Sequence, residues 1–221
     1  MSEPTDPPAP SDRTRIRRIA EHGHYDRRTI DAILDAGLVA HVGLVDPMGS
    51  PVVVPMAYAR VGDRVIVHGS VASRTVRAGA SGVAMCVTVT LLDGLVVARS
   101  LFESSFRYRS VVVMGDAVAI DDPVEKLDLL LRLSEHLMPG RTTEARHPSI
   151  KELAATRLFA LALDETSAKV NDGFPTDDPA DLDLDVWAGV VPMRTVLDQP
   201  IDAPDLRAGL AVDPSVRRWL T

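Results

Sequence analysis

The sequence contains one cysteine, Cys86, among its 221 residues. A single cysteine excludes an internal disulfide framework and any zinc site built from several cysteines, and it fits a reducing compartment. The chain also lacks an apolar run near the roughly 18 residues that a membrane span needs. Its first residues are acidic and rich in proline, unlike a secretory signal. We therefore expect a cytoplasmic protein with no membrane segment.

Several motifs of common enzyme classes are missing. Gly-x-Ser-x-Gly does not occur, so the nucleophile elbow of the α/β hydrolases is absent. The glycine-rich loops of dinucleotide-binding and Walker-type proteins are absent too. His22 and His24 lack further ligands at metal spacing, so we predict no metal site. The net charge of −7 argues against nucleic acid as a partner, because affinity for phosphate backbones needs a concentrated basic surface.

The two ends of the chain differ in composition from the middle. Residues 1–13 are dominated by proline, serine and aspartate, which predicts a disordered tail before a domain over residues 14–170. The arginine-rich segment 13–28 predicts a charged helix face or a contact with an acidic patch of a partner subunit. Residues 171–221 are rich in aspartate and proline, and we expect this extension to pack on the barrel or on a partner subunit.

Apolar spacing and capping residues predict the helices. Asp26 is suited to cap a helix over residues 27–36, which Gly37 ends. Leucines at helical spacing predict a second helix over residues 123–138. Shorter helices are predicted over residues 71–80 and 149–156.

Runs rich in β-branched residues predict about six antiparallel strands. Asp93 and Gly94 are predicted to form a turn after the fourth of them. With helices only in some connections, this order indicates a mainly β fold, a small closed or partly split barrel, and not a parallel doubly wound sheet. The predicted strands cover residues 38–45, 51–59, 64–69, 83–92, 108–120 and 157–165.

The segment VIVHGSVASRT, residues 65–75, predicts a phosphate site. A strand here passes hydroxyl groups and Arg74 to the start of a helix, where backbone N–H groups carry partial positive charge. The alternative is an ordinary strand end with a capped helix. His68 is either a histidine at the barrel rim or a proton donor beside this site. His41 is expected in the core or an interface, and Cys86 is expected as a buried small hydrophobe.

Four motifs in order, VHGSVASRT, DGLVVARS, YRSVVVMGDA and WAGVVP, make the chain resemble the pyridoxamine 5′-phosphate oxidase-related FMN-binding split barrels. It is similar to their flavin-nucleotide-binding and nitroimidazole-reductase-like branch. The resemblance covers about residues 14–195 and implies an FMN-binding split barrel and a homodimer with cofactor sites at the interface. The C-terminal DPSVRRWLT does not reproduce the arginine motif of the B6 oxidases, so vitamin B6 oxidation is not expected.

The resemblance also implies which residues hold FMN. Residues 73–75 match the phosphate contacts, although Thr75 stands where family oxidases carry lysine, and residues 68–70 follow the ribityl chain and ring edge. Positive charge near the flavin ring is expected from Arg99, Arg109 or Lys169. The full set of implied contacts is Val54, Pro55, Met56, His68, Gly69, Ser70, Ser73, Arg74, Thr75, Arg109, Ser110 and, from the second subunit, Trp187.

The resemblance implies a flavin-dependent oxidoreductase in which a reduced nicotinamide passes electrons through FMN to a small acceptor such as a nitroaromatic, a quinone or oxygen. His68 is the candidate proton donor. One alternative is a haem-binding or haem-degrading protein with His41 or His68 as axial ligand. The others are a non-catalytic flavin carrier or sensor, and an enzyme that uses a deazaflavin.

Overall fold

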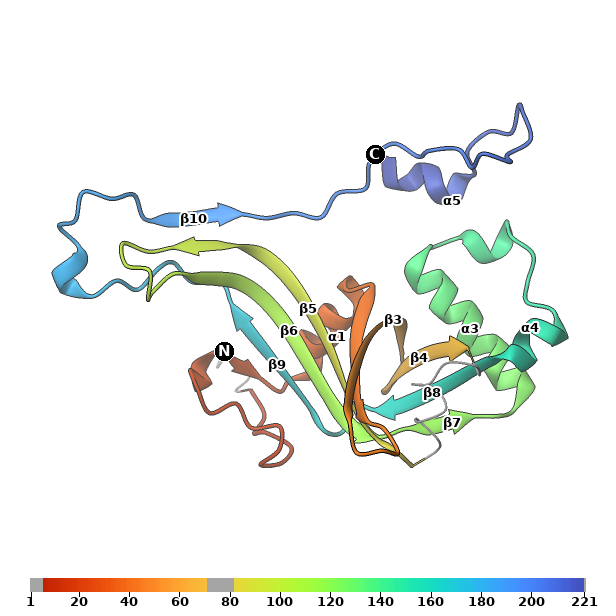
Figure 1. The fold of residues 1–221 in the computed structure, drawn as a ribbon, viewed down its shortest axis with the longest axis horizontal. Helices are drawn as coiled ribbons and strands as arrows, with labels where there is room; N and C mark the ends of the chain where they lie inside the picture. The colour runs from red at the N-terminus through yellow and green to blue at the C-terminus, as the bar shows by residue number, and fades with distance from the viewer. Residues whose placement is uncertain (1–5, 71–81, 221) are drawn as a thin grey trace, which may run out of the picture.

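The computed structural model describes residues 6–70 and 82–220 (Figure 1). The predicted helix over residues 71–80 lies outside the described residues. Within the described part, no helix is both long and apolar enough to span a membrane. The helices are α1 (Arg27–Ala36), α3 (Pro123–Leu137), α4 (Ile150–Ala155) and α5 (Pro214–Arg217), with the 3-10 turns η1 (Ala20–His22), η2 (Arg141–Thr143), η3 (Pro179–Asp181) and η4 (Arg218–Leu220).

The strands pair antiparallel in the order β1-β9-β6-β5-β2-β3-β4-β8-β7, and β10 pairs with β5. β6 continues into β7 across Ala117, and β7 pairs with β8, so this bend joins the two sheets into a split barrel. The strands are β1 (Gly23–His24), β2 (Val39–Val45), β3 (Pro51–Val61), β4 (Arg64–Ser70), β5 (Ala84–Val97), β6 (Ser105–Asp116), β7 (Val118–Ile120), β8 (Thr156–Ala162), β9 (Thr166–Asn171) and β10 (Gly189–Pro192).

These strands confirm the predicted mainly β class and split barrel, with ten strands in the described part instead of about six. The predicted strand over residues 108–120 is bent into β6 and β7. The short strands β1, β9 and β10 were not predicted. They are only two to six residues long, and none shows a clear alternation of apolar and polar residues.

The predicted turn at Asp93–Gly94 is wrong. β5 runs through both residues, with a bulge between Leu92 and Gly94. The prediction fails because an Asp-Gly pair that suits a turn also suits a bulge. The carboxylate of Asp93 accepts two hydrogen bonds from Arg109, both at 2.8 Å. A Cβ at Gly94 would lie 2.9 Å from the carbonyl oxygen of Val191, so glycine allows β10 to approach here.

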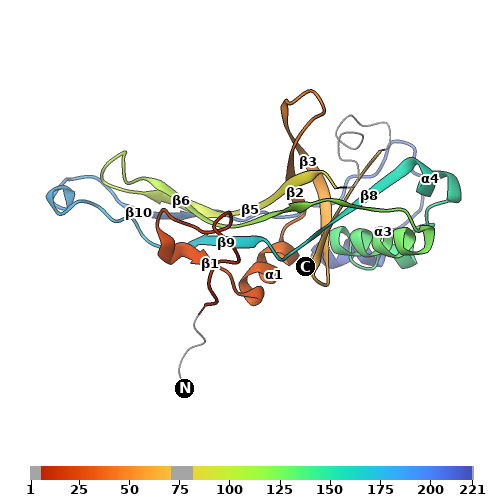
Figure 2. The same ribbon diagram turned by 90° about the horizontal axis from the view of Figure 1, so that it is seen from below.

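Alternate side chains of the strands fill the barrel, and α1 closes one end of it. Tyr58 is fully buried, and its hydroxyl donates to the carbonyl of Leu34 at 2.5 Å. Ile66 instead belongs to a second cluster, outside the barrel and under α3, together with Ile120 and Leu129. Figure 2 shows α1 and α3 on the same side of the sheet, while the tip of the β2–β3 hairpin projects from the other side.

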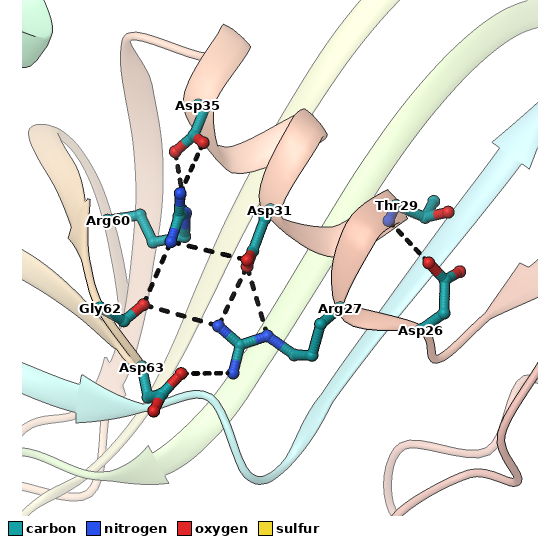
Figure 3. Close-up of polar contacts among 8 residues, drawn as sticks. All are labelled: Asp26, Arg27, Thr29, Asp31, Asp35, Arg60, Gly62 and Asp63. Atoms are coloured by element: carbon teal, nitrogen blue, oxygen red, sulfur yellow. Dashed lines mark hydrogen bonds and ion pairs between the residues drawn. The ribbon is translucent and has the colours of Figure 1, made fainter.

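The structure confirms the predicted bounds of α1. The Asp26 side chain accepts from the backbone N–H of Thr29 at 2.8 Å, as an N-cap should, and Gly37 follows the last turn. Two arginines then tie the helix to the β3–β4 turn (Figure 3). Arg60 of β3 and Arg27 of α1 share Asp31 and also pair with Asp35 and Asp63, respectively.

Both terminal segments contact the folded part. Among residues 6–13, which form no helix or strand, Asp6 accepts from the backbone N–H of Tyr25, and Ser11 donates to Glu165. After β9 the chain follows the far end of the β5–β6 hairpin, where Asp177 pairs with Arg99 at 2.8 Å. It then forms β10 and reaches α5, beside α3 (Figure 1).

Candidate functional site

His68 lies on the outer face of β4. Val65 and Val67 of this strand point into the barrel core, whereas Ile66 packs under α3. Because successive side chains alternate between the two faces of a strand, His68 shares the face of Ile66. The imidazole therefore lies between β4 and the helices, and not inside the barrel.

A cavity of about 570 Å³ opens beside this histidine. Its wall comes from α3, from the η2 segment after it, and from α4. Figure 1 shows α3 and α4 on the side of β4 and β8. Most side chains on the α3 side are apolar, and two arginines line the η2 side. The residues that characterise it are His68, Leu130, Leu131, Met138, Arg141 and Arg146.

The imidazole of His68 has one ring nitrogen without a polar partner among the described residues, although the ring also has a hydrogen bond with the backbone of Ala57. Its Nδ1 atom is buried and has no hydrogen-bond partner in the described part of the chain. Burial lowers the pKa of His68, and the backbone of Ala57 offsets this only in part. Burial thus favours the neutral form of the ring, and its Nδ1 makes no hydrogen bond to the described residues.

The arginines of the cavity are paired with carboxylates. Arg141 contacts Glu144 at 3.2 Å and also pairs with Asp213. Arg146 donates to both oxygens of Glu152 at 2.6 and 2.8 Å, which holds the pKa of that carboxyl far below its usual range. An apolar wall with guanidinium groups at one side suits a flat apolar ligand that carries carboxylates.

A second surface, the outer face of the sheet, carries other predicted residues. Pro55 of β3 pairs in register with His41 of β2, which is exposed there, and His41 pairs with Thr88 of β5. A groove of about 380 Å³ on the sheet is lined in part by Val53 and Cys86. The prediction that Cys86 is buried is wrong, because its position on β5 faces this groove and leaves it half-buried.

Strand alternation separates residues that the sequence groups together. Val54 and Met56 pack against the barrel core, whereas Pro55 between them is exposed. Arg109 and Ser110 likewise take opposite faces of β6, and Ser110 Oγ donates to the carbonyl of Lys169 at 3.4 Å.

The remaining predicted contacts are placed as follows. Gly69 and Ser70 end β4 opposite Arg157 and Thr156 of β8. Ser73, Arg74 and Thr75 lie outside the described residues, so the predicted phosphate site stays a prediction. Trp187 is 64% exposed and precedes β10, whose Gly189 pairs with Val97 at the end of β5. Figure 1 shows β10 far from α3.

The three cations considered for the flavin ring each have a partner. Arg99 pairs with Asp177, and Arg109 pairs with Asp93, which raises the pKa of Arg109. Lys169 donates to the carbonyl of Arg18 at 2.9 Å. None of the three therefore stands out as a charge held ready for a ligand.

The cavity wall on α3 was missed from the sequence. Helical spacing of the leucines predicts the helix but not which of them are buried: Leu129 and Leu133 are the buried leucines of α3, and Leu130 and Leu131 line the cavity. The available signal was an excess of leucine, because these four residues span more of the helix circumference than one packed stripe needs.

Comparison with known proteins decides the family. A family model described as pyridoxamine 5′-phosphate oxidase matches residues 26–170, from the cap of α1 to β9. The chain belongs to this family. It is one of flavin-binding split barrels, as the sequence motifs predict. A comparison with curated protein sequences finds no match.

Two solved structures are similar over most of the chain. The flavocytochrome Anf3 from Azotobacter vinelandii is 38% identical with a TM-score of 0.90, and the alignment covers 96% of this chain and 99% of that one. A FAD and heme binding protein from Mycobacterium smegmatis is 44% identical with a TM-score of 0.85, over 90% and 97% of the two chains.

A more distant structure shares the fold. It is a candidate 5-nitroimidazole antibiotic resistance protein from Bacteroides thetaiotaomicron, 22% identical with a TM-score of 0.55. The alignment covers 67% of this chain and 86% of that chain.

Proposed function

We propose that this protein binds a flavin and a haem and passes electrons from a reduced nicotinamide to a small acceptor. The observation that carries the proposal is His68, a neutral imidazole with an unpartnered buried nitrogen at a cavity of about 570 Å³. Two relatives that are 38% and 44% identical to the chain bear the names flavocytochrome and FAD and heme binding protein.

The residues of the cavity fit a haem. His68 offers a neutral nitrogen, which is the form of histidine that ligates iron. Leu130, Leu131 and Met138 would exclude water from the faces of the macrocycle. Arg141 and Arg146 now pair with Asp213 and Glu152, and they would pair with the two propionate groups of a bound haem in their place.

The two cofactors would divide the chemistry. A flavin accepts hydride and releases electrons singly, and a haem supplies one-electron and oxygen chemistry. We propose FAD as the flavin, because the relative that is 44% identical is named for it. FMN, which the sequence motifs imply, remains the alternative that the mass of the released cofactor decides.

In this proposal His68 positions the haem iron and does not act as the proton donor. A nitrogen that binds iron cannot deliver a proton, so the two roles exclude each other. The role as proton donor belongs to the second candidate, a flavin oxidoreductase without haem. A carrier or sensor that binds flavin would show no oxidation of a reduced nicotinamide with any acceptor.

We also propose that the protein acts as a homodimer. In the single chain, Val39, Val45 and Val53 on the outer faces of β2 and β3 are between half and two-thirds exposed. Several exposed valines on one face of a sheet are typical of an interface.

The experiment that tests the haem site compares two histidine variants. His68→Ala should lower the haem affinity of the purified protein at least tenfold, about 1.4 kcal/mol, with flavin content unchanged. His41→Ala is the matched control, because His41 is exposed on β2 and does not line the cavity. Absorbance titration with hemin measures both. Unchanged haem affinity in His68→Ala would reject His68 as the ligand.

A further inference from the structure

Residues 193–211 form a segment that we call the C-terminal arm. Every residue of the arm is exposed, and none belongs to a helix or strand. Among the described residues, its backbone hydrogen bonds to other parts of the chain are confined to its first residue, where the N–H of Met193 donates to the carbonyl of Asp93. The others close two short turns within the arm, at Leu206 and Leu210.

The arm is nevertheless held at both ends. Before it, β10 pairs with β5 over residues 94–97. After it, Asp213 pairs with Arg141, and the backbone N–H of Ser215 donates to Glu144 at 2.9 Å. Ser215 is fully buried in this contact. Figure 1 shows the arm extended between β10 at one end of the molecule and α5 at the other.

The exposed apolar side chains of the arm are unfavourable for a single chain in water. Its apolar side chains include Val196 at 78% exposure and Ile201 at 96%. A segment that leaves its apolar side chains in water gains nothing from their burial to offset the entropy of staying ordered. The large apolar residues of the arm are Met193, Val196, Leu197, Ile201, Leu206 and Leu210.

We propose that the arm closes over a second copy of this chain. The inference rests on the proposed homodimer and names the segment that fastens it. The occupant is a second copy because the same chain leaves a second apolar surface uncovered, the outer faces of β2 and β3. In a closed two-fold dimer each copy presents the same surfaces, so the arm and the sheet face would be covered on both copies at once.

The size of the arm agrees with this role. A stable interface takes about 20 to 30 residues from each partner. The arm supplies 19 consecutive exposed residues, and the sheet face adds Val39, Val45 and Val53. The arm and these three valines together reach the number of residues that one partner of a stable interface usually supplies.

The test is the double variant Leu197→Asp, Ile201→Asp in the full chain with its cofactors bound. Sedimentation velocity over a range of concentrations should show a wild-type dimer of 23.8 kDa chains. The double variant should raise the dimer dissociation constant at least tenfold and keep the wild-type absorption spectrum. Val124→Asp in α3 is the control, because Val124 is 76% exposed but lies outside both surfaces, and it should leave the constant unchanged.

Hydrogen exchange on the wild-type protein gives an independent measurement. Amides of residues 193–211 should exchange slowly in the dimer and faster on dilution into monomer. If the double variant leaves the dimer dissociation constant unchanged and the arm exchanges fast, the proposed contact between the arm and the second copy is wrong. The proposal of a homodimer would be unaffected by that result. A monomeric wild-type protein would overturn both, and the cofactor proposal would still be judged by the absorption spectrum.

Discussion

His68 differs from the other histidines of the chain in its surroundings. His136 contacts the carbonyl of Gly37 at 2.7 Å, His147 contacts the carbonyl of Thr142 at 3.1 Å, and His24 pairs with Asp6. These rings satisfy a nitrogen with a polar group of the chain itself. His68 also has a hydrogen bond with the backbone of Ala57, but in addition its buried Nδ1 has no partner among the described residues and the ring borders a cavity large enough for a cofactor.

The pKa of His68 predicts how stability depends on pH. Burial lowers its pKa in the folded state, so below the unfolded value of about 6.5 the unfolded chain binds more protons. The free energy of unfolding should therefore fall as the pH drops below that value. His68→Gln, which does not titrate, should show a shallower fall between pH 7.5 and 5.5.

Urea denaturation at several pH values measures this difference. The relevant comparison is the slope of the free energy of unfolding against pH, since the two proteins can differ in stability at every pH. Parallel curves for wild type and variant would contradict the assignment of a lowered pKa to His68.

Gly37 is predicted to be required for space and not for backbone conformation. Its φ is −84°, but an added Cβ would lie 2.5 Å from a methyl group of Val89 and 2.6 Å from the hydroxyl of Tyr58. Gly37→Ala should cost about 1 to 3 kcal/mol by overpacking. Gly115→Ala, where nothing lies within 4 Å of the added atom, should stay within about 0.5 kcal/mol. Equal urea midpoints for the two variants would contradict this.

At the residue scale the sequence identified His68 as a candidate but not its surroundings. The alternation of β4 already predicts that His68 shares the face of Ile66. That this face meets α3 depends on the pairing of β4 with β8, which brings together residues about 90 positions apart. No local pattern contains that pairing.

At the scale of elements, helices with a clear capping residue were predicted almost to the residue. Asp26 caps α1, Asp122 caps α3, and Ser149 with Glu152 forms a capping box at α4. The bulge in β5 was mistaken for a turn, because Asp93 and Gly94 suit both and only the partner strands distinguish them.

The bulge at Gly94 gives a prediction about β10. An added Cβ would lie 2.9 Å from the backbone oxygen of Val191, so Gly94→Ala should push β10 away from β5. Hydrogen exchange of residues 189–192 should become faster, with a loss of about 1 to 3 kcal/mol in the free energy of unfolding. Gly43→Ala in β2, where the nearest atom lies at 3.6 Å, is the control. Unchanged exchange in β10 would show that the strand tolerates the methyl group.

At the scale of the whole molecule, the order of strand-like runs predicted the fold class but not how the pieces assemble. The family match ends at residue 170, so the arm and α5 lie beyond the part that the family model describes. In this structure α5 is docked on η2, and Arg141 of η2 lines the cavity. The C-terminal extension therefore contacts the wall of the proposed haem cavity in addition to its proposed contact with a second copy.

The absorption spectrum of the purified protein tests the central claim most directly. After expression with a haem precursor supplied, the account predicts the two visible bands of a flavin together with a Soret band. Mass spectrometry of the released cofactors should find haem and a flavin in similar amounts. Flavin bands without a Soret band, under conditions in which hemin added to the protein also fails to bind, would contradict it.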